Sequence, residues 1–474
     1  MEGGGKLDGS LQPGPGIKRR TIRGAGVLLM SQAVRVGLNG VVTVVLARLL
    51  TPADFGLVAM VTTITGFAAL FKDAGLSMVT IQRERMSDAQ VTALFWVNVA
   101  VSVTLMLVLM AAAPWVVKAY GEPRLQGITL ALASVFVLGG LNAQHFALLR
   151  RQMRFAAVAA VELGALVVGG VVGIALAAAG KGYWALVGMS AAVAVVTTAG
   201  AWVASGWSPG WPRRGVGLRS MLRFGGTMLG LEMLHYVSGQ ADNFLIGRRW
   251  GDAALGFYGK AFRMLDLMTG QLNGVFRSVA VPALSRLQTQ PEQRRRHFLN
   301  GYSIVVALSI LIISCSAVYA PEAVAVVLGP QWESVGPLFR LLAPGAVAAA
   351  LMNSQGWLAL ACGRVGQQLR LALWVVPLTV LAFVVGLPWG PSGVAMAYSV
   401  AKVSIVWPVT AVMTRGTGVS VADVFRAARP ALIAGTVAAG LGWLLRAVLE
   451  RHLGPFAVLA IGGATMTGLY LGLL

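Results

Sequence analysis

Charged residues are scarce in this chain, and their scarcity excludes an ordinary soluble domain. Only 12% of the 474 residues are Asp, Glu, Lys or Arg, whereas soluble domains have about 25%. Hydrophobic residues make up 57% and gather in long apolar runs. The composition therefore predicts an all-α integral membrane protein with many spans.

Cysteines and known catalytic motifs are also few. The two cysteines, Cys315 and Cys362, lie in apolar runs, so neither a disulfide framework nor a CxxC metal pattern is expected. The sequence has no HExxH motif, no GxSxG motif and no phosphate-binding glycine loop. The segments expected to face outside are only a few residues long. We therefore expect neither an enzyme nor a resident cofactor or metal ion.

Acidic residues are the rarer of the two charge types. The chain has 17 Asp and Glu against 38 Lys and Arg, a net charge of +21. Such an excess could indicate nucleic-acid binding. However, most of the basic residues fall between apolar runs, on every second connecting segment. This is the positive-inside pattern of a membrane protein whose N-terminus is cytoplasmic, so we expect no nucleic-acid partner.

Fourteen apolar runs are long enough to span a bilayer. They cover residues 23–48, 53–78, 89–115, 127–149, 155–180, 182–206, 218–247, 253–281, 298–328, 334–362, 367–389, 391–414, 424–449 and 454–474. We expect a disordered cytoplasmic N-terminus (1–22), an N-lobe of six helices (23–206), a cytoplasmic linker (207–217), a C-lobe of six helices (218–414) and a final helix pair (424–474).

An internal repeat supports the two lobes. The segment 47–58 aligns with the segment 247–258 at a constant offset of 200 residues, and Arg35 then falls on His235. Both repeats would begin on the cytoplasmic side, so they are parallel repeats. Repeated lobes around a central site are typical of transporters that work by alternating access.

Several motifs resemble those of a known family. They are Arg48-Leu49-Leu50-Thr51-Pro52-Ala53-Asp54-Phe55-Gly56, Leu148 to Phe155, Gly182 to Val187, Ala241 to Arg248, Pro282 to Leu287 and Leu328 to Trp332. In this order they resemble the Wzx-type polysaccharide flippases, near the colanic acid exporter branch of the multidrug/oligosaccharidyl-lipid/polysaccharide exporter superfamily.

The resemblance implies a function and a location. Such proteins move undecaprenyl-diphosphate-linked oligosaccharide from the cytoplasmic to the periplasmic leaflet of the bacterial inner membrane. The products are surface polysaccharides such as exopolysaccharide, O-antigen or capsule. The implied partners are this lipid-linked substrate, membrane lipids and possible polymerase machinery, and H⁺ or Na⁺ could couple to transport.

Arg35 is the first candidate substrate-binding residue. It lies some twelve residues into the first span, with Gln32 and Asn39 on the same helix face. A charge at this depth normally faces a protein interior or a wet cavity. Arginine also suits phosphate, since its fork can pair with two oxygens. The alternative is a structural ion pair with Glu232 or Asp73.

The eighth span has a polar face along its length. Lys260, Arg263, Asp266, Asn273 and Arg277 recur on it at helical spacing. The cations and Asn273 are candidate contacts for the diphosphate or the glycan. Alternatively, Asp266 only neutralises Arg263, and Arg277 extends to the membrane interface.

The seventh span adds acidic groups. Glu232, His235 and Asp242 lie on one face and could transfer a proton, bind a sodium ion or form a hydrogen-bonded structural set. Lys402 in the twelfth span and Glu162 in the fifth could each be cavity or structural residues.

Two other functions compete with the flippase. A cation-coupled drug or metabolite antiporter of the same superfamily would need a cavity dominated by acidic groups, yet the charges within the spans are mostly basic. A membrane-bound polymerase or ligase would need a catalytic constellation, and none is evident. The sequence therefore favours a flippase with a cationic cavity.

Overall fold

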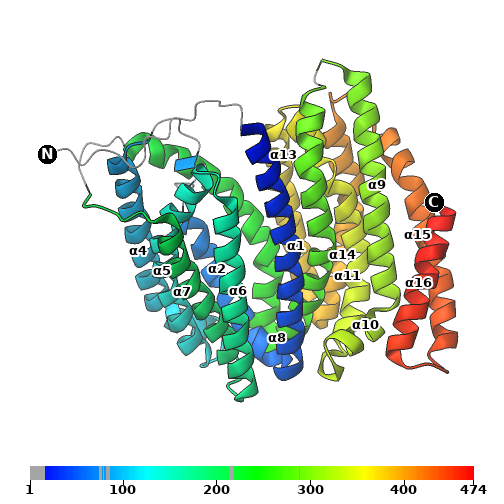
Figure 1. Ribbon diagram of the computed structural model, residues 1–474. Helices are drawn as coiled ribbons and strands as arrows, with labels where there is room; N and C mark the ends of the chain where they lie inside the picture. The colour runs from blue at the N-terminus through cyan, green and yellow to red at the C-terminus, as the bar shows by residue number, and fades with distance from the viewer. Residues whose placement is uncertain (1–16, 74–76, 78–79, 82–85, 213–217, 288) are drawn as a thin grey trace. The chain divides into compact units, whose positions relative to one another are not determined.

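The computed structural model describes residues 17–73, 77, 80–81, 86–212, 218–287 and 289–474. Within these ranges the chain is helical and contains no strand (Figure 1). Helices are the expected solution for apolar runs in a bilayer, because each backbone N–H and C=O finds its partner within the same segment.

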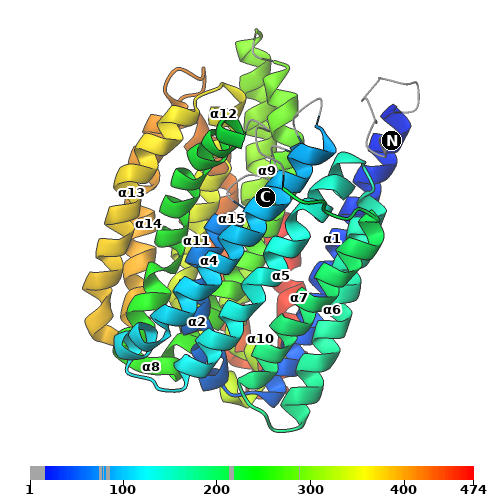
Figure 2. The same ribbon diagram turned by 90° about the vertical axis from the view of Figure 1, so that its left-hand side faces the viewer.

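The chain divides into two compact units, Met1–Tyr236 and Val237–Leu474. The first unit contains α1 (Ile17–Leu49), α2 (Pro52–Asp73), α4 (Asp88–Tyr120), α5 (Leu125–Arg151), α6 (Phe155–Ala178), α7 (Trp184–Ser205) and the start of α8 (Leu218–Ser285). Within this unit α5 packs between α4 and α7, and α6 packs between α1 and α7 (Figure 2).

The second unit continues from Val237 in α8. Its other helices are α9 (Pro291–Val318), α10 (Ala320–Val327), η1 (Pro330–Trp332), α11 (Val335–Asn353), α12 (Gly356–Ala361), α13 (Val365–Gly386), η2 (Leu387–Trp389), α14 (Gly390–Thr414), α15 (Val421–Leu449) and α16 (Pro455–Leu473). Here α14 packs against α11 and α13, and α15 packs against α9 and α16.

The fourteen-helix fold class predicted from the sequence is confirmed. Eleven stretches of the described residues are long and apolar enough to span a membrane, and one of them, Gly366–Thr414, holds both α13 and α14. The predicted seventh and eighth spans are the two parts of α8. They are separated by Gly251, whose φ of 82° is not helical and favours glycine. The repeat-related Thr51 likewise separates α1 from α2.

The division between the units lies inside α8 rather than in the connection before it. Tyr236, the last residue of the first unit, contacts α2 within that unit: its hydroxyl donates to the carbonyls of Thr62 and Thr63, at 3.2 and 3.1 Å. A Cβ on Gly66 would lie 2.1 Å from this hydroxyl, so a side chain at that position would require the Tyr236 ring to move. The predicted lobes with their linker at 207–217 stay a prediction.

The final helix pair belongs to the core of the second unit. Ala428, Ala434, Met466 and Tyr470 from α15 and α16 are buried in one hydrophobic cluster with residues of α9 and α11. Tyr470 also donates a hydrogen bond of 2.9 Å to the Ala307 carbonyl.

An ion pair lies at the C-terminal end of α15. Arg446 Nε donates to the buried Glu322 of α10 at 2.8 Å, and the same guanidinium contacts Glu450. The pair joins the C-terminal end of α15 to α10.

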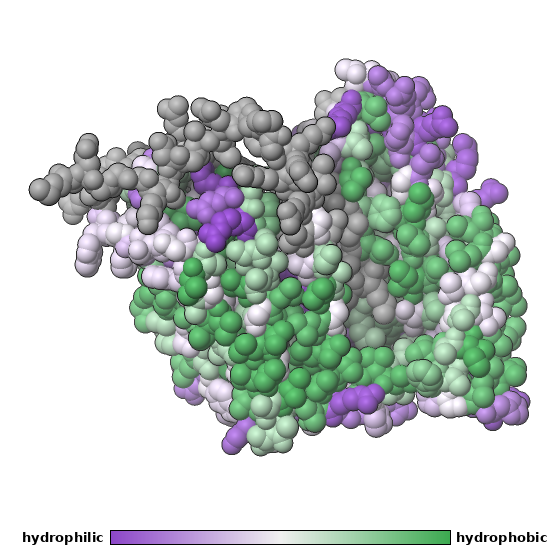
Figure 3. Space-filling model, viewed as in Figure 1, coloured by the Kyte–Doolittle hydropathy of each residue, from purple (hydrophilic) through white to green (hydrophobic). Residues whose placement is uncertain are grey.

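Surface hydropathy follows the expected membrane pattern. On the face shown in Figure 3, hydrophobic residues cover the middle of the helices, while hydrophilic residues gather near their ends. This arrangement matches a protein whose middle zone faces lipid.

Candidate functional site

Two arginines share one carboxylate in the first unit. Arg35 Nη1 on α1 lies 3.6 Å from Glu162 Oε2 on α6, and Arg150 Nη2 at the end of α5 lies 3.6 Å from Glu162 Oε1. Arg35 also donates through Nη2 to Gln32. We call Arg35, Arg150 and Glu162 the arginine–glutamate triad.

Close packing of α1 against α6 positions the triad. A Cβ on Gly170 would lie 2.7 Å from the Val42 side chain, so this glycine lets the two helices approach. Arg35 precedes Val42 by seven residues and Glu162 precedes Gly170 by eight. Because α1 and α6 run in parallel, this spacing of about two turns places the two charged side chains at one level.

The triad is accessible rather than sealed in the protein core. The side chains of Arg35, Glu162 and Arg150 are 44%, 34% and 48% exposed. Ion pairs this exposed contribute only about 0.2–1 kcal/mol to stability. Nor do the 3.6 Å contacts qualify as hydrogen bonds. The arrangement can therefore exchange one anion for another at low cost.

The second unit contains a buried acidic group. Asp242 on α8 is 2% exposed and accepts a hydrogen bond of 2.8 Å from the Tyr258 hydroxyl. Its other oxygen accepts from the Asn243 backbone N–H at 2.8 Å. Lys402 on α14 interacts electrostatically with Asp242, and its Nζ lies 5.6 Å from the centroid of the Tyr398 ring. The structure thus brings together two residues predicted separately, Asp242 and Lys402.

The polar face predicted on the eighth span divides into different environments. Lys260 is buried, and its Nζ lies 4.9 Å from the centroid of the Trp332 ring. The like charge of Arg263 repels it. Arg263, Asp266 and Arg277 are exposed. Lys260 therefore packs against an aromatic ring, while the other cations remain accessible.

Asn273 has a structural contact. Its side-chain oxygen accepts a hydrogen bond of 3.1 Å from Trp357 Nε1, and Trp357 in turn stacks on Phe276. On α1, Asn39 is exposed and Gln32 is partly buried. The side chains of Glu232 and His235 lie outside the described residues.

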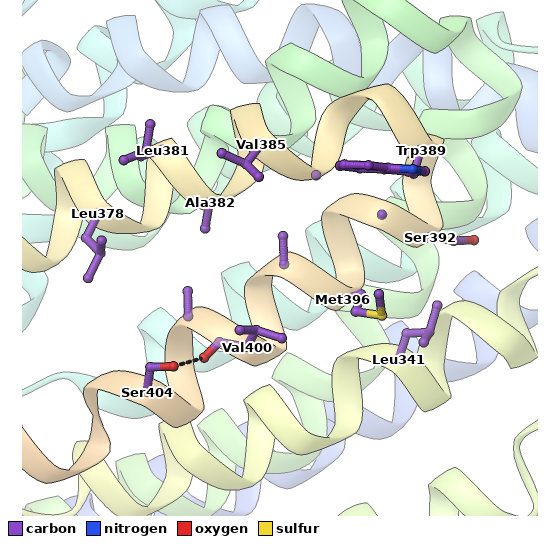
Figure 4. A pocket seen from close by; sticks show the side chains of 14 residues that line it. Leu341, Leu378, Leu381, Ala382, Val385, Trp389, Ser392, Met396, Val400 and Ser404 are labelled. Carbon is purple, nitrogen blue, oxygen red and sulfur yellow. Dashed lines mark hydrogen bonds between the residues drawn. The ribbon is translucent and has the colours of Figure 1, made fainter.

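A groove without charged side chains lies between α13 and α14. It measures about 660 Å³, and its lining includes Leu381, Val385, Met396 and Val400, as Figure 4 shows. Ser404 also lines it, but the hydroxyl donates to the Val400 carbonyl of its own helix. With 3.6 residues per turn, Lys402 lies on the opposite side of α14 from this lining. The helix therefore separates the groove from the Asp242–Lys402 contact.

Two residues of these charged clusters, Arg150 and Tyr258, were not predicted from the sequence. Arg150 directly follows a predicted span (127–149), a position where a basic residue ordinarily serves to orient the protein in the membrane. The contact of Tyr258 could not be predicted, because nothing in a single sequence shows that its hydroxyl donates to Asp242. The available signal for the triad was Glu162, a lone carboxylate among the Ala, Val and Gly residues of its span.

The charged groups of the triad suit anion binding. Among the residues that the structure describes, no group of three His, Cys, Asp or Glu side chains could hold a metal ion. In the first unit, the triad has two cations to one anion.

Comparison with known proteins places the chain in a family. The family model described as "Polysaccharide biosynthesis protein" matches residues 45–337. The chain is 23% identical over 376 residues to the lipopolysaccharide biosynthesis protein WzxC of Escherichia coli (strain K12), covering 78% of this chain and 76% of that protein. It is 26% identical over 333 residues to the succinoglycan biosynthesis transport protein ExoT of Rhizobium meliloti (strain 1021), covering 69% and 67%.

The fold has a solved counterpart. The lipid II flippase MurJ in an inward closed conformation matches with a TM-score of 0.74 at 11% identity, over 95% of this chain and 98% of that one. At this identity the match concerns the fold alone. The sequence resemblance to Wzx-type flippases is confirmed by the family match and by the relatives. The chain belongs to the polysaccharide biosynthesis protein family and is a multi-pass membrane protein with the fold of a lipid flippase.

Proposed function

We propose that the protein flips an undecaprenyl-diphosphate-linked oligosaccharide from the cytoplasmic to the periplasmic leaflet of the bacterial inner membrane, by alternating access. The observation that carries the proposal is the arginine–glutamate triad. Two guanidinium groups from different helices approach one point, where a diphosphate could bind both. The family match and the relatives named for polysaccharide biosynthesis support the same substrate class.

The physical barrier to flipping explains why cations are needed within the spans. A charged diphosphate would pay a prohibitive desolvation cost in bare hydrocarbon, whereas the polyprenyl tail can stay in lipid throughout. Arginines that are both inside the spans and accessible lower that cost by pairing with the phosphoryl oxygens. Arg263 and Arg277, exposed on α8, are further candidate contacts in the second unit.

Reconstitution of the full chain tests this function. Vesicles would contain a fluorescent saccharide linked to a short prenyl diphosphate, and a membrane-impermeant quencher would report which leaflet holds it. We expect the protein to accelerate flipping over protein-free vesicles, and the diphosphate-linked lipid to flip faster than its monophosphate-linked analogue. Equal rates with and without the protein would refute the proposal.

A further inference from the structure

The single carboxylate of the triad has a position that pair stability alone does not explain. Each of its oxygens faces a different arginine at 3.6 Å, one on α1 and one on α5. A carboxylate that served to fix one arginine would instead form a bidentate ion pair with it, with both contacts at hydrogen-bond distance. Arg295 and Asp423 at the start of α9 and α15 form such a pair, with contacts of 3.0 and 2.8 Å.

The two arginines have other contacts that do not depend on Glu162. Arg35 donates to Gln32 one turn earlier on α1, and the Arg150 guanidinium lies 5.9 Å from the centroid of the Phe146 ring one turn earlier on α5. These contacts lie within each helix, so they can hold the guanidinium groups without Glu162. The arginines therefore form a site that remains assembled while its anion changes.

We propose that Glu162 is the resident counter-ion of the Arg35–Arg150 pair, and that it excludes the headgroups of bulk anionic lipid until a diphosphate takes its place. This inference rests on the proposed function for its substrate class. The two kinds of headgroup differ in charge. A phosphodiester headgroup such as that of phosphatidylglycerol brings one negative charge and would only replace the one that Glu162 already supplies. A diphosphate diester brings two, one for each arginine, and so gains attraction from the exchange.

The need for such exclusion follows from concentration. Bulk anionic lipid is far more abundant in a bacterial membrane than any biosynthetic intermediate, and accessible arginines attract it. Without a counter-ion of its own, the pair would be occupied by bulk headgroups. Glu162 thus sets specificity, although it need not touch the bound substrate.

The experiment uses Glu162→Gln in the full chain, in nanodiscs of pure phosphatidylcholine and in nanodiscs containing phosphatidylglycerol. The probe is a saccharide linked to farnesyl diphosphate, and its affinity is measured by titration. In pure phosphatidylcholine we expect the variant to bind the probe about three- to tenfold more tightly than the wild type, because a competing anion is gone. Phosphatidylglycerol should then weaken probe binding to the variant by a similar factor and leave the wild type nearly unchanged.

Two matched variants separate this role from a structural one. Glu162→Asp keeps the charge and should behave as the wild type. Glu122→Gln neutralises a carboxylate that accepts hydrogen bonds from Arg124 in the turn between α4 and α5, at 2.7 and 2.9 Å. This variant should bind the probe with wild-type affinity in both kinds of nanodisc. If Glu162→Gln binds the probe more weakly in pure phosphatidylcholine, or if phosphatidylglycerol acts equally on variant and wild type, the counter-ion inference is wrong.

The proposed function can fail separately. If the wild type does not bind the diphosphate probe at all, the flippase proposal loses its support. The binding of phosphatidylglycerol would still test whether Glu162 excludes bulk anionic lipid. Native mass spectrometry would count phosphatidylglycerol retained by each variant. We expect more retained by Glu162→Gln than by the wild type, and the excess should disappear in the double variant Arg35→Ala/Glu162→Gln. No excess in Glu162→Gln would overturn the inference.

Discussion

Tyr258 donates a hydrogen bond of 2.8 Å to the carboxylate of Asp242, and both side chains are buried in the second unit. Removing a hydrogen-bond donor from a buried carboxylate lowers the free energy of unfolding by about 1–3 kcal/mol. Tyr258→Phe removes the hydroxyl and keeps the ring, so it should lower the thermal unfolding midpoint of the purified protein. Tyr183→Phe, in the turn before α7, is the control and should leave the midpoint nearly unchanged. A Tyr258→Phe protein as stable as the wild type would show that Lys402 and the Asn243 backbone N–H suffice for Asp242.

The Glu322–Arg446 pair should anchor the last two helices. Glu322 and Arg446 are only 7% and 14% exposed, and breaking a pair this buried costs about 3–5 kcal/mol. Glu322→Gln is therefore expected to destabilise the docking of α15 and α16, visible as faster limited proteolysis of the C-terminal segment. Glu450→Gln removes the more exposed partner of the same arginine and should have a smaller effect. Equal proteolysis rates in both variants would contradict the anchoring role of Glu322.

A side chain at Gly66 should conflict with the Tyr236 ring and destabilise the protein. Gly66→Ala would place a Cβ 2.1 Å from the Tyr236 hydroxyl, so we expect a loss of about 1–3 kcal/mol in stability. Gly164→Ala is the matched control in α6, where a Cβ meets nothing within 4 Å, and it should be neutral or slightly stabilising. Combining Gly66→Ala with Tyr236→Ala should recover part of the loss. No recovery would mean that another contact restricts Gly66.

Membrane orientation can be tested with single cysteines after replacement of Cys315 and Cys362. Lys181→Cys, between α6 and α7, should react with an impermeant thiol reagent in intact cells. Gln293→Cys, at the start of α9, should be protected until the cells are opened. Both positions are exposed, so burial would not mask the result. Labelling of position 293 in intact cells would contradict a cytoplasmic N-terminus with fourteen spans.

The helices were predictable because their signal is local. Long apolar runs, separated by Gly, Pro and charged residues, fix each span without reference to its neighbours. The break at Gly251 was also visible, because the repeat places it 200 residues after Thr51. Long-range packing was not visible in this way. Nothing in the sequence shows that α1 lies against α6, a contact that depends on Gly170 meeting Val42.

The candidate site shows the same limit. Depth within a span identified Arg35 as a residue needing a partner, and the partner that the structure describes is Glu162 on α6. The side chains of the two acidic residues first considered, Glu232 and Asp73, lie outside the described residues, so a pair with either of them stays a prediction. Arg150 lies at a helix end, where basic residues typically set membrane orientation, yet its long side chain reaches the same carboxylate. Contacts of this kind depend on the tertiary arrangement, which a single sequence does not show.

The central claim is that Arg35 and Arg150 bind the diphosphate during flipping, and the rate of flipping in vesicles tests it most directly. The control is Arg296→Ala, an exposed cation in the first turns of α9. Arg294 is unsuitable, because it is buried and donates to the Thr417 carbonyl at 3.0 Å. We predict that Arg35→Ala and Arg150→Ala each slow flipping of the diphosphate-linked saccharide at least about tenfold, or ~1.4 kcal/mol, while Arg296→Ala stays near the wild-type rate. Wild-type flipping by the double variant Arg35→Ala/Arg150→Ala would contradict the account.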